Sequence, residues 1–329
     1  MKNMHKVLAG LMATGLLLTG CSTSSTKTTG SADNGTAATD TGYDASWYKG
    51  PGYDKLKEEL GKADVDLSAA DGKLKDILKK GKITMATSPD YPPSEFVDTQ
   101  GNVKGSDVLL GQYIANSLGV ELEVETMDFN AVLTAVDTGK ADMGISGFGY
   151  KKDRAEQFEL SVGYQANSSA AHHTLLVPAD KVDEYKSLSD FDGKKIDAQA
   201  NSLQEMYVND QIKDADLQLV STLDQAILEL QTGKIDAIAL DSTTAKNYAD
   251  TSDGMFASVL VANGVEFDLS QYEDTAGNVV AVKKGETSLI DAINTIIKSL
   301  PTSGKYEENL YTDMYYAACV EAEVSPNEE

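Results

Sequence analysis

Apolar residues recur at helical spacing along much of the chain, and short apolar runs separate these stretches. The apolar positions within 74–78 precede Gly81, which predicts a helix that ends at a left-handed glycine. Residues 83–86 then read as a strand, and residues 110–118 fit one face of a second helix. Apolar and acidic residues alternate over 120–124, as in a half-buried strand. Alternating helices and strands predict an α/β fold.

Two stretches in the middle of the chain match each other. Residues 132–146 read VLTAVDTGKADMGIS, and residues 226–240 read AILELQTGKIDAIAL. In each, apolar residues at helical spacing lead to Thr-Gly-Lys-x-Asp, where Gly139 and Gly233 suit a helix end. A short apolar strand follows at once. The pattern predicts one helix–turn–strand unit in each half of the chain, and chance reuse of a common turn is the alternative.

Gly147 and Asp241 follow these two strands at equivalent positions. Parallel α/β sheets bind ligands beyond the carboxyl ends of their strands. Two lobes that face each other would bring the Gly147 and Asp241 regions to opposite walls of one cleft. The repeat therefore predicts a ligand site between two lobes.

Composition and charge narrow the class of protein. The chain has 329 residues, of which 41% are hydrophobic and 24% charged, so it can bury cores for about two domains. Its 28 Lys and Arg against 52 Asp and Glu give a formal charge of −24. This charge argues against nucleic acid or an anionic lipid surface as a partner. Two cysteines and three histidines argue against a disulfide framework or a four-thiolate zinc site, and we expect no metal and no cofactor.

The N-terminus has the pattern of a secretory signal. Lys2 and Lys6 precede the apolar run 7–18, which is too short for a comfortable membrane span. The following Leu-Thr-Gly-Cys, which ends at Cys21, resembles the bacterial lipobox. The resemblance implies that the Cys21 thiol carries a diacylglyceryl group and becomes the new N-terminus. An ordinary signal peptide with a chance cysteine is the alternative.

The segments around the predicted lobes have distinct compositions. Residues 22–43 are rich in Ser, Thr, Gly and Ala and predict a flexible tether. Residues 44–72 form an N-terminal extension, and the charged stretch 47–80 is expected to be helical. The acidic end after Tyr316, including the tail 321–329, is expected to be frayed and solvated.

Two further features are expected to be structural. Cys319 has no partner cysteine in the tethered domain and is expected to be a buried apolar residue. His172 and His173 are adjacent in a predicted strand, so their side chains would point to opposite faces and would not chelate one ion.

Six motifs follow one another behind the lipobox. The first is ATSPDYPPSEFVD, over 86–98, and the others lie at 127–147, 151–161, 190–207, 234–242 and 281–310. Their order resembles that of the extracellular solute-binding proteins of polar amino-acid ABC transporters, and the first motif is similar to the first strand and ligand loop of that family.

The resemblance implies the fold of the type II periplasmic binding proteins. This α/β fold has two Rossmann-like lobes joined by two hinge strands, with the second lobe inserted in the first. Lobe 1 would comprise 73–168 and 277–320, and lobe 2 would comprise 172–272. Hinges would lie near 169–171 and 273–276.

The resemblance also implies two residues that bind the charged groups of an α-amino acid. Arg154 matches the carboxylate-binding Arg, and its planar guanidinium can donate two parallel hydrogen bonds. A surface salt bridge within the charged run 151–154 is the alternative. Asp241 matches the ammonium-binding Asp, and a helix N-cap before 242–244 is a second role that could coexist.

Five more residues match ligand-binding positions of the family. Tyr91 and Phe129 would stack on the ligand, Gly147 would offer its backbone, and Ser202 and Gln204 would cap the carboxylate. Core packing is the alternative for Phe129. For Ser202 and Gln204 the alternative is an ordinary polar loop.

The chain also departs from the family pattern. Gly149 stands in place of a hydroxyl residue, and Asn201 and Leu203 replace small residues. Ser88 stands where several members carry an Asp, which argues against a cationic amino acid, although Asp90 is close by. These departures indicate a modified side-chain pocket.

The resemblance implies a monomeric, lipid-anchored receptor on the extracellular or periplasmic face. It would capture a free amino acid and deliver it to a membrane permease that works with an ATPase subunit. One alternative is a dehydratase of prephenate or arogenate on the same fold, with Glu95 or Asp90 as the acid. Another is an amino-acid sensor module, although no transmembrane helix to a signalling domain is expected after residue 21.

Overall fold

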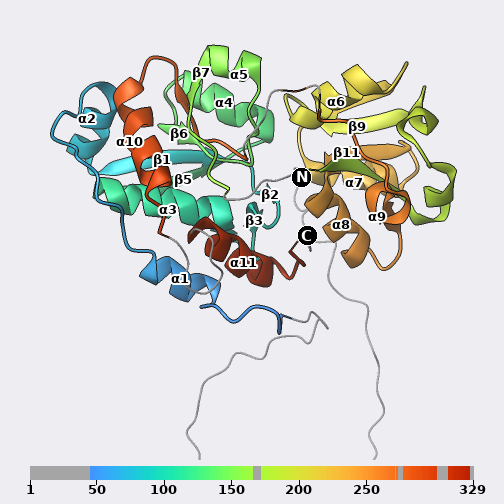
Figure 1. The fold of residues 1–329 in the computed structure, drawn as a ribbon, viewed down its shortest axis with the longest axis horizontal. Helices are drawn as coiled ribbons and strands as arrows, with labels where there is room; N and C mark the ends of the chain where they lie inside the picture. Colours follow the sequence, from blue (N-terminus) through green and yellow to red (C-terminus); the bar gives the residue numbers. More distant parts are fainter. Residues whose placement is uncertain (1–44, 166–171, 271, 273–276, 302–309, 327–329) are drawn as a thin grey trace, which may run out of the picture. The chain divides into compact units, whose positions relative to one another are not determined.

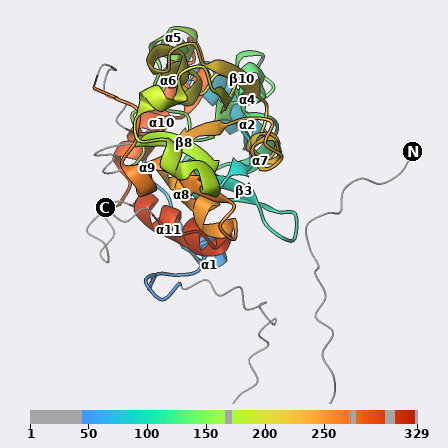
Figure 2. The same cartoon turned by 90° about the vertical axis from the view of Figure 1, so that its right-hand side faces the viewer.

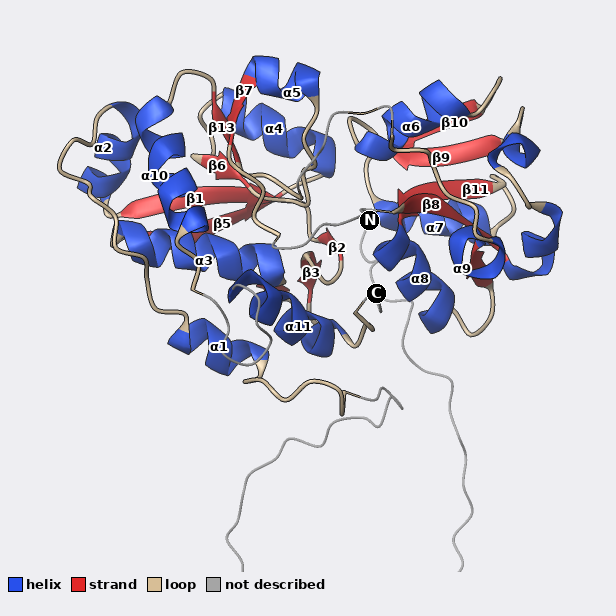
Figure 3. Cartoon of the chain, viewed as in Figure 1, coloured by secondary structure: helices blue, strands red, loops and turns tan. Residues whose placement is uncertain are grey.

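A computed structural model describes residues 45–165, 172–270, 272, 277–301 and 310–326 (Figure 1). The signal segment with Cys21, the tether over 22–43 and the hinges expected near 169–171 and 273–276 lie outside the described residues. Contacts group Tyr43–Glu329 into one compact unit. Within it the structure has two five-stranded sheets, each with helices on both faces (Figure 3).

The first sheet has the strand order β5-β1-β6-β13-β7. β1 runs parallel to β5 and β6, whereas β13 runs antiparallel to β6 and β7. The strands are β1 (Lys82–Thr87), β5 (Glu121–Thr126), β6 (Met143–Gly144), β7 (Phe158–Leu160) and β13 (Ala281–Lys283).

Alternating side chains of β1 face two different cores. Ile83 and Met85 are fully buried against the helices on one face, and Ala86 is buried against the opposite face. The helices on the first face include α3 (Ser106–Leu118) and α10 (Thr287–Lys298), and α4 (Phe129–Asp137) packs on the opposite face. We call this sheet with its helices the first lobe.

The second sheet has the order β10-β9-β11-β8-β12 and forms the second lobe. α6 (Leu203–Gln211) and α9 (Val259–Asn263) pack on one face, and α7 (Leu223–Gln231) and α8 (Ser242–Thr251) pack on the other (Figure 2). The strands are β8 (His173–Pro178), β9 (Lys195–Gln199), β10 (Asp216–Val220), β11 (Ala237–Asp241) and β12 (Phe256–Ser258). Two short 3-10 helices, Ala179–Glu184 and Leu188–Phe191, lie between β8 and β9.

The repeated sequence unit has the predicted structure in both lobes. In the first lobe α4 leads through Gly139 to β6, and in the second α7 leads through Gly233 to β11. Both glycines have positive φ, +74° and +69°, which a residue without Cβ adopts at little cost. The helix–turn–strand prediction is confirmed.

The second lobe is inserted into the first, as expected. All five strands of its sheet lie between residues 173 and 258, and β13 returns afterwards to the middle of the first sheet. The α/β architecture with an inserted second lobe is therefore confirmed.

The N-terminal extension packs on the first lobe but is not one helix. α1 (Tyr53–Glu59) and α2 (Gly72–Lys80) are separated by residues 60–71, so the expectation of helix throughout 47–80 is wrong. Gly61 has φ +67°, which interrupts a right-handed helix. Tyr53 and Leu56 are buried in the first core, so α1 is part of that lobe.

The C-terminal segment is more ordered than expected. α11 (Leu310–Ala322) continues past Tyr316, and Val324 behind it is buried. Glu321 pairs with Lys104, at 2.6 Å between carboxylate oxygen and Nζ. The expectation of a frayed end is therefore wrong up to residue 324. None of the helices among the described residues is long and apolar enough to cross a membrane.

Candidate functional site

Arg154 is buried between the two lobes. It lies on α5 (Lys152–Gln157) of the first lobe and is 5% exposed. One of its terminal nitrogens donates to the carbonyl of Gly149, and the other donates to the carbonyl of Asn201 in the second lobe, at 2.8 Å. The guanidinium carbon lies 5.0 Å from the ring centroid of Phe148, and this cation–π contact stabilises the positive charge.

The charge of Arg154 has no acidic partner among the described residues. No described carboxylate lies within 4.0 Å of its guanidinium, and Lys151 pairs with Asp153 instead. Burial lowers the pKa of Arg154 to about 10, so the group keeps its proton at neutral pH. The surface-salt-bridge alternative is wrong, because the side chain is buried. A buried, unpaired guanidinium is suited to an anionic ligand group.

Asp241 lies at the end of β11, directly before α8. Its Oδ1 accepts hydrogen bonds from the backbone N–H groups of Thr243 and Thr244, at 2.9 and 3.1 Å. These bonds make Asp241 the N-cap of α8, which confirms that alternative role. Its Oδ2 accepts a hydrogen bond from the hydroxyl of Tyr91, which belongs to the first lobe. The ammonium-binding role stays a prediction.

Tyr91 comes from a small three-stranded sheet of the first lobe. This sheet consists of β2 (Asp90–Tyr91), β3 (Glu95–Val97) and β4 (Val103–Lys104). The Tyr91 ring packs against the apolar cluster of the second lobe that includes Leu223. Tyr91 is thus placed between the lobes, and its stacking on a ligand stays a prediction.

Gly147 follows β6 in the left-handed region, with φ +57°. Its backbone N–H donates to Oδ2 of Asp107 at 2.9 Å. The hydroxyls of Tyr164 and Tyr311 donate to the same carboxyl group, at 2.9 and 2.8 Å. The Gly147 amide is therefore turned toward the first lobe, and a contact of this residue with a ligand stays a prediction.

A second carboxyl group lies beside Asp107. Glu95 is 1% exposed and accepts a hydrogen bond from the Ser146 hydroxyl at 3.0 Å. Burial and the charge of Asp107 raise the pKa of Glu95 well above its usual range, and burial also raises the pKa of Asp107. Through their hydrogen bonds to Ser146 and Gly147, the two carboxyl groups hold the loop that follows β6.

Phe129, Ser202 and Gln204 have clear local roles. The Phe129 ring packs on Phe148, with centroids 4.9 Å apart, which agrees with core packing. The Ser202 hydroxyl caps α6 by accepting from Glu205 N at 3.1 Å. The Gln204 amide lies 3.0 Å from Nδ1 of His173. Ligand contacts of these three residues stay predictions.

The adjacent histidines point in different directions. His172 is exposed and contacts Glu266, whereas His173 is buried beside Tyr207. Burial lowers the pKa of His173 to about 4, so it is neutral at physiological pH. The described residues contain no cluster of His, Cys, Asp and Glu that could hold a metal ion.

Two of the sequence departures fit each other in space. A Cβ atom added to Gly149 would lie 2.4 Å from Cδ1 of Leu203, in the other lobe. The large Leu203 side chain therefore occupies the space that a side chain at position 149 would need.

The sequence did not indicate the contacts that three residues of this region make. Phe148 supports Arg154, Asn201 accepts from it through a main-chain carbonyl, and Gln199 contacts Asp90. A main-chain acceptor leaves no side-chain signal, and Phe148 reads only as an apolar residue after a strand. Asp90 at the start of β2 was noted in the sequence, but its partner Gln199 comes from the other lobe.

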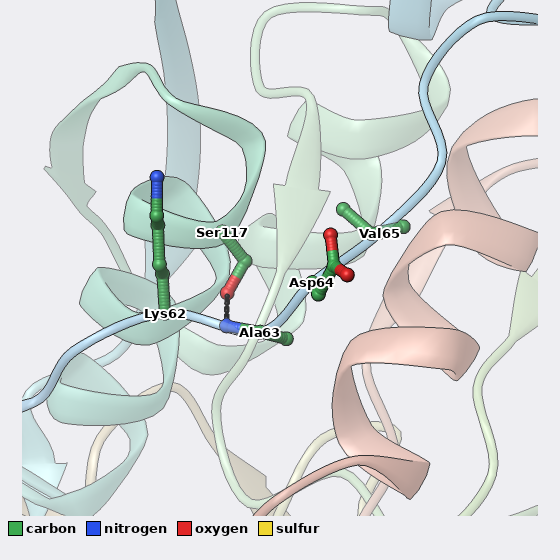
Figure 4. Close-up of a pocket in the computed structure, with 5 residues that line it drawn as sticks. All are labelled: Lys62, Ala63, Asp64, Val65 and Ser117. Atoms are coloured by element: carbon green, nitrogen blue, oxygen red, sulfur yellow. Dashed lines mark hydrogen bonds between the residues drawn. The ribbon is translucent and has the colours of Figure 1, made fainter.

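A separate hollow lies on the flank of the first lobe. Lys62, Ala63, Asp64, Val65 and Ser117 line it, and Ala63 N donates to the Ser117 hydroxyl at 2.9 Å (Figure 4). It contains none of the residues that were predicted to bind a ligand. The candidate site is therefore the region between Arg154 and Asp241.

Known proteins resemble this chain over most of its length. The arginine-binding extracellular protein ArtP of Bacillus subtilis is 29% identical over 234 residues, which cover 70% of this chain and 84% of that protein. A crystal structure of an amino acid ABC transporter substrate-binding protein from Streptococcus pneumoniae, bound to L-arginine, has 30% identity and a TM-score of 0.65. The match covers 78% of this chain and all of that chain.

A second solved structure shows the same fold at lower identity. It is the ancestral amino acid-binding protein AncCDT-1, a precursor of cyclohexadienyl dehydratase, at 24% identity and a TM-score of 0.61. It covers 78% of this chain and all of its own chain. A family model described as bacterial extracellular solute-binding proteins, family 3, matches residues 83–313. With the two-lobed fold and the buried Arg154, this match shows that the chain belongs to the extracellular solute-binding proteins of family 3.

Proposed function

We propose that this protein is the substrate-binding lipoprotein of an ABC importer and that it captures a polar amino acid between its lobes. The unpaired guanidinium of Arg154 supports this proposal most directly. It would bind the ligand's carboxylate, and Asp241 in the second lobe would bind the ammonium group. A ligand held by both residues contacts both lobes and therefore favours the closed arrangement.

The side chain of the ligand is not expected to be cationic. Ser88 stands at the position where several family members carry an Asp. The nearby Asp90 carboxylate accepts three hydrogen bonds from the protein itself, from Ser88, Gln199 and Leu223. Both similar proteins cited above with bound or named arginine share only about 30% of their residues with this chain, so a different side-chain preference is compatible with the resemblance.

The test is thermal unfolding of residues 43–329 with each of the twenty amino acids, cystine, ornithine and short peptides. The protein is first unfolded and refolded to remove carried-over ligand. A ligand at a hundred times its Kd adds about 2.7 kcal/mol to the free energy of unfolding. We expect such a shift with one or a few amino acids.

Two variants show whether the expected residues bind the ligand. Arg154→Ala should abolish the shift, whereas Lys152→Ala, an exposed neighbour on the same helix, should leave it unchanged. Asp241→Asn should also abolish it while it keeps the α8 N-cap, because Asn caps helices as well as Asp. A shift that survives Arg154→Ala would contradict the proposed site.

The dehydratase alternative has a separate readout. Glu95 is buried beside Ser146 and Asp107, so its position does not favour a role as an acid that protonates a substrate. Consumption of added prephenate or arogenate by the protein would nevertheless establish that activity. The absence of a shift with every amino acid would redirect the search to such acids and to other solutes.

The wider role follows from the same proposal. The lipobox supports anchoring through Cys21, with residues 22–43 as a tether between the membrane and the lobes. The liganded protein would dock on a permease in the same membrane. ATP hydrolysis by a cytoplasmic subunit would then drive release of the amino acid.

A further inference from the structure

Asp90 of the first lobe is hydrogen-bonded to two elements of the second lobe. Its Oδ2 accepts hydrogen bonds from Leu223 N at 2.9 Å and from the Gln199 side-chain amide at 3.0 Å. Its Oδ1 accepts from the Ser88 hydroxyl at 3.0 Å, within its own lobe. Leu223 is the first residue of α7 and Gln199 the last of β9, so one carboxylate joins two elements of the other lobe.

The position of this carboxylate is electrostatically favourable. The backbone N–H groups at the start of a helix carry partial positive charge, and Leu223 N is one of these groups in α7. The N-cap residue Thr222 accepts a hydrogen bond from Gln225 N with its hydroxyl. Leu223 N, in the same first turn of α7, is left for Asp90. Burial raises the pKa of Asp90, so desolvation offsets part of this gain.

The Asp90 contacts differ from the other contacts between the lobes. Arg154 and Tyr91 also bridge the lobes, but both are expected to touch the ligand. Asp90 instead accepts hydrogen bonds from a hydroxyl, a side-chain amide and a main-chain N–H of the protein itself. Asp90 can therefore stabilise closure independently of the ligand's chemistry.

We propose that Asp90 is a positioning residue that holds the two lobes closed and thereby sets part of the ligand affinity without contacting the ligand. The inference rests on the proposed function, because closure matters for affinity only if a ligand binds between the lobes. The apparent Kd equals the intrinsic Kd divided by the fraction of protein in the competent state. Loss of the Asp90 contacts lowers that fraction and raises the apparent Kd of every ligand by the same factor.

The first experiment measures lobe closure without any ligand. Residues 43–329 carry Lys79→Cys in α2 and Lys213→Cys in the second lobe, both exposed, for spin or fluorescent labels. Cys319 is fully buried and is not expected to take a label. Asp90→Ala should shift the distance distribution away from that of the parent protein, toward an open form. Asp90→Asn, which keeps an acceptor but loses the charge, should give an intermediate distribution.

The matched control is Asp224→Ala. Asp224 is exposed at the same end of α7, so the variant removes one negative charge from this helix terminus without touching the Asp90 bonds. Its distance distribution should equal that of the parent. An unchanged distribution in Asp90→Ala, with a folded protein by circular dichroism, would overturn the proposal.

The second experiment measures affinity for each of the twenty amino acids by calorimetry. Asp90→Ala should raise the Kd of every amino acid that binds by about tenfold, with their order unchanged. A changed order would overturn the proposal, because it would mean that Asp90 contacts the ligand's side chain. If no amino acid binds even the parent protein, the proposed function fails, and the ligand-free distances still decide whether Asp90 holds the lobes together.

Discussion

Asp197 lies in β9 of the second lobe with its side chain fully buried. Neither of its carboxylate oxygens has a hydrogen-bond partner among the described residues. Burial raises the pKa of Asp197 to about 7, and the nearby charge of Glu229 contributes in the same direction. The carboxylate is thus an unfavourable feature of an otherwise apolar core.

Replacement of this residue should stabilise the protein in a pH-dependent way. In the unfolded chain an Asp has a pKa near 3.9, so between about pH 4 and pH 7 the folded state binds more protons than the unfolded state. Stability is therefore lost as pH rises through this window. Asp197→Ala removes this loss and should raise the free energy of unfolding by roughly 1–3 kcal/mol at pH 8.

Urea denaturation at pH 5 and pH 8 measures the effect. The gain of Asp197→Ala over the parent should be larger at pH 8 than at pH 5. Asp180→Ala, which removes an exposed Asp of the same lobe, should give no pH-dependent gain. An equal gain at both pH values would mean that Asp197 does not titrate in this range.

The sequence marked Arg154 and Asp241 as candidates for binding the charged groups of a ligand, a role that stays a prediction, but it did not show their surroundings. Arg154 and Asp241 could be predicted because the family motif marks them and their chemistry matches a zwitterion. The contact of Asp90 with Leu223 could not, because it joins residues 133 positions apart across the two lobes. The fit between Gly149 and Leu203 could not be predicted either, because the sequence showed each only as a separate departure from the family pattern.

At the scale of elements, α11 supports the loop that follows β6 in the first lobe. The Tyr311 hydroxyl donates to Oδ1 of Asp107 at 2.8 Å and lies 3.0 Å from the Ser106 hydroxyl. Asp107 in turn accepts from Gly147 N, so the C-terminal helix is connected to the loop after β6. This connection runs through one buried carboxyl group.

Loss of the Tyr311 hydroxyl should weaken this connection. Tyr311→Phe leaves part of the buried Asp107 carboxyl unsatisfied and should lower the free energy of unfolding by about 1–3 kcal/mol. Tyr113→Phe is the control, because Tyr113 is 2% exposed and its hydroxyl has no hydrogen bond to the described residues. Thermal unfolding of both variants decides the comparison, and equal losses would contradict a specific role of the Tyr311 bond.

Helix ends were the most predictable elements. Gly81 lies in the left-handed region at the end of α2, as predicted, and Gly119 has the same conformation at the end of α3. The break after α1 was missed because the residues over 60–71 mix charged and apolar side chains in a pattern that a helix could also carry. Tertiary packing of Leu60 and Ala63 on the first lobe decides their conformation instead.

At the scale of the whole molecule, the folded unit is larger than the family match. The family model covers 83–313, yet Tyr53, Leu56 and Leu74 before it and Ala317 after it are buried in the first core. The sequence left open whether the N-terminal extension packs on the lobe. Its apolar residues are interspersed with charged residues, so their burial could be seen only with the partner helices in place.

The expected membrane anchor is tested on the whole protein in its cells. Cys21→Ser removes the thiol that would carry the lipid, so the protein should move from the membrane fraction to the soluble extracytoplasmic fraction. Cys319→Ser is the control, because this cysteine is buried in α11 and should leave the distribution unchanged. Retention of Cys21→Ser in the membrane would contradict lipid anchoring at this residue.

The return of β13 to the first sheet also has a consequence for biosynthesis. A chain made from its N-terminus completes the second lobe, whose strands are contiguous, before the first lobe receives its last strand and α10. Until residues 281–283 arrive, the edges of β6 and β7 at Gly144 and Leu160 lack the neighbour that later joins them. A nonsense mutation or a protease cut after the second lobe would therefore leave that lobe intact, whereas the first lobe, although its synthesis began earlier, would lack β13 and α10.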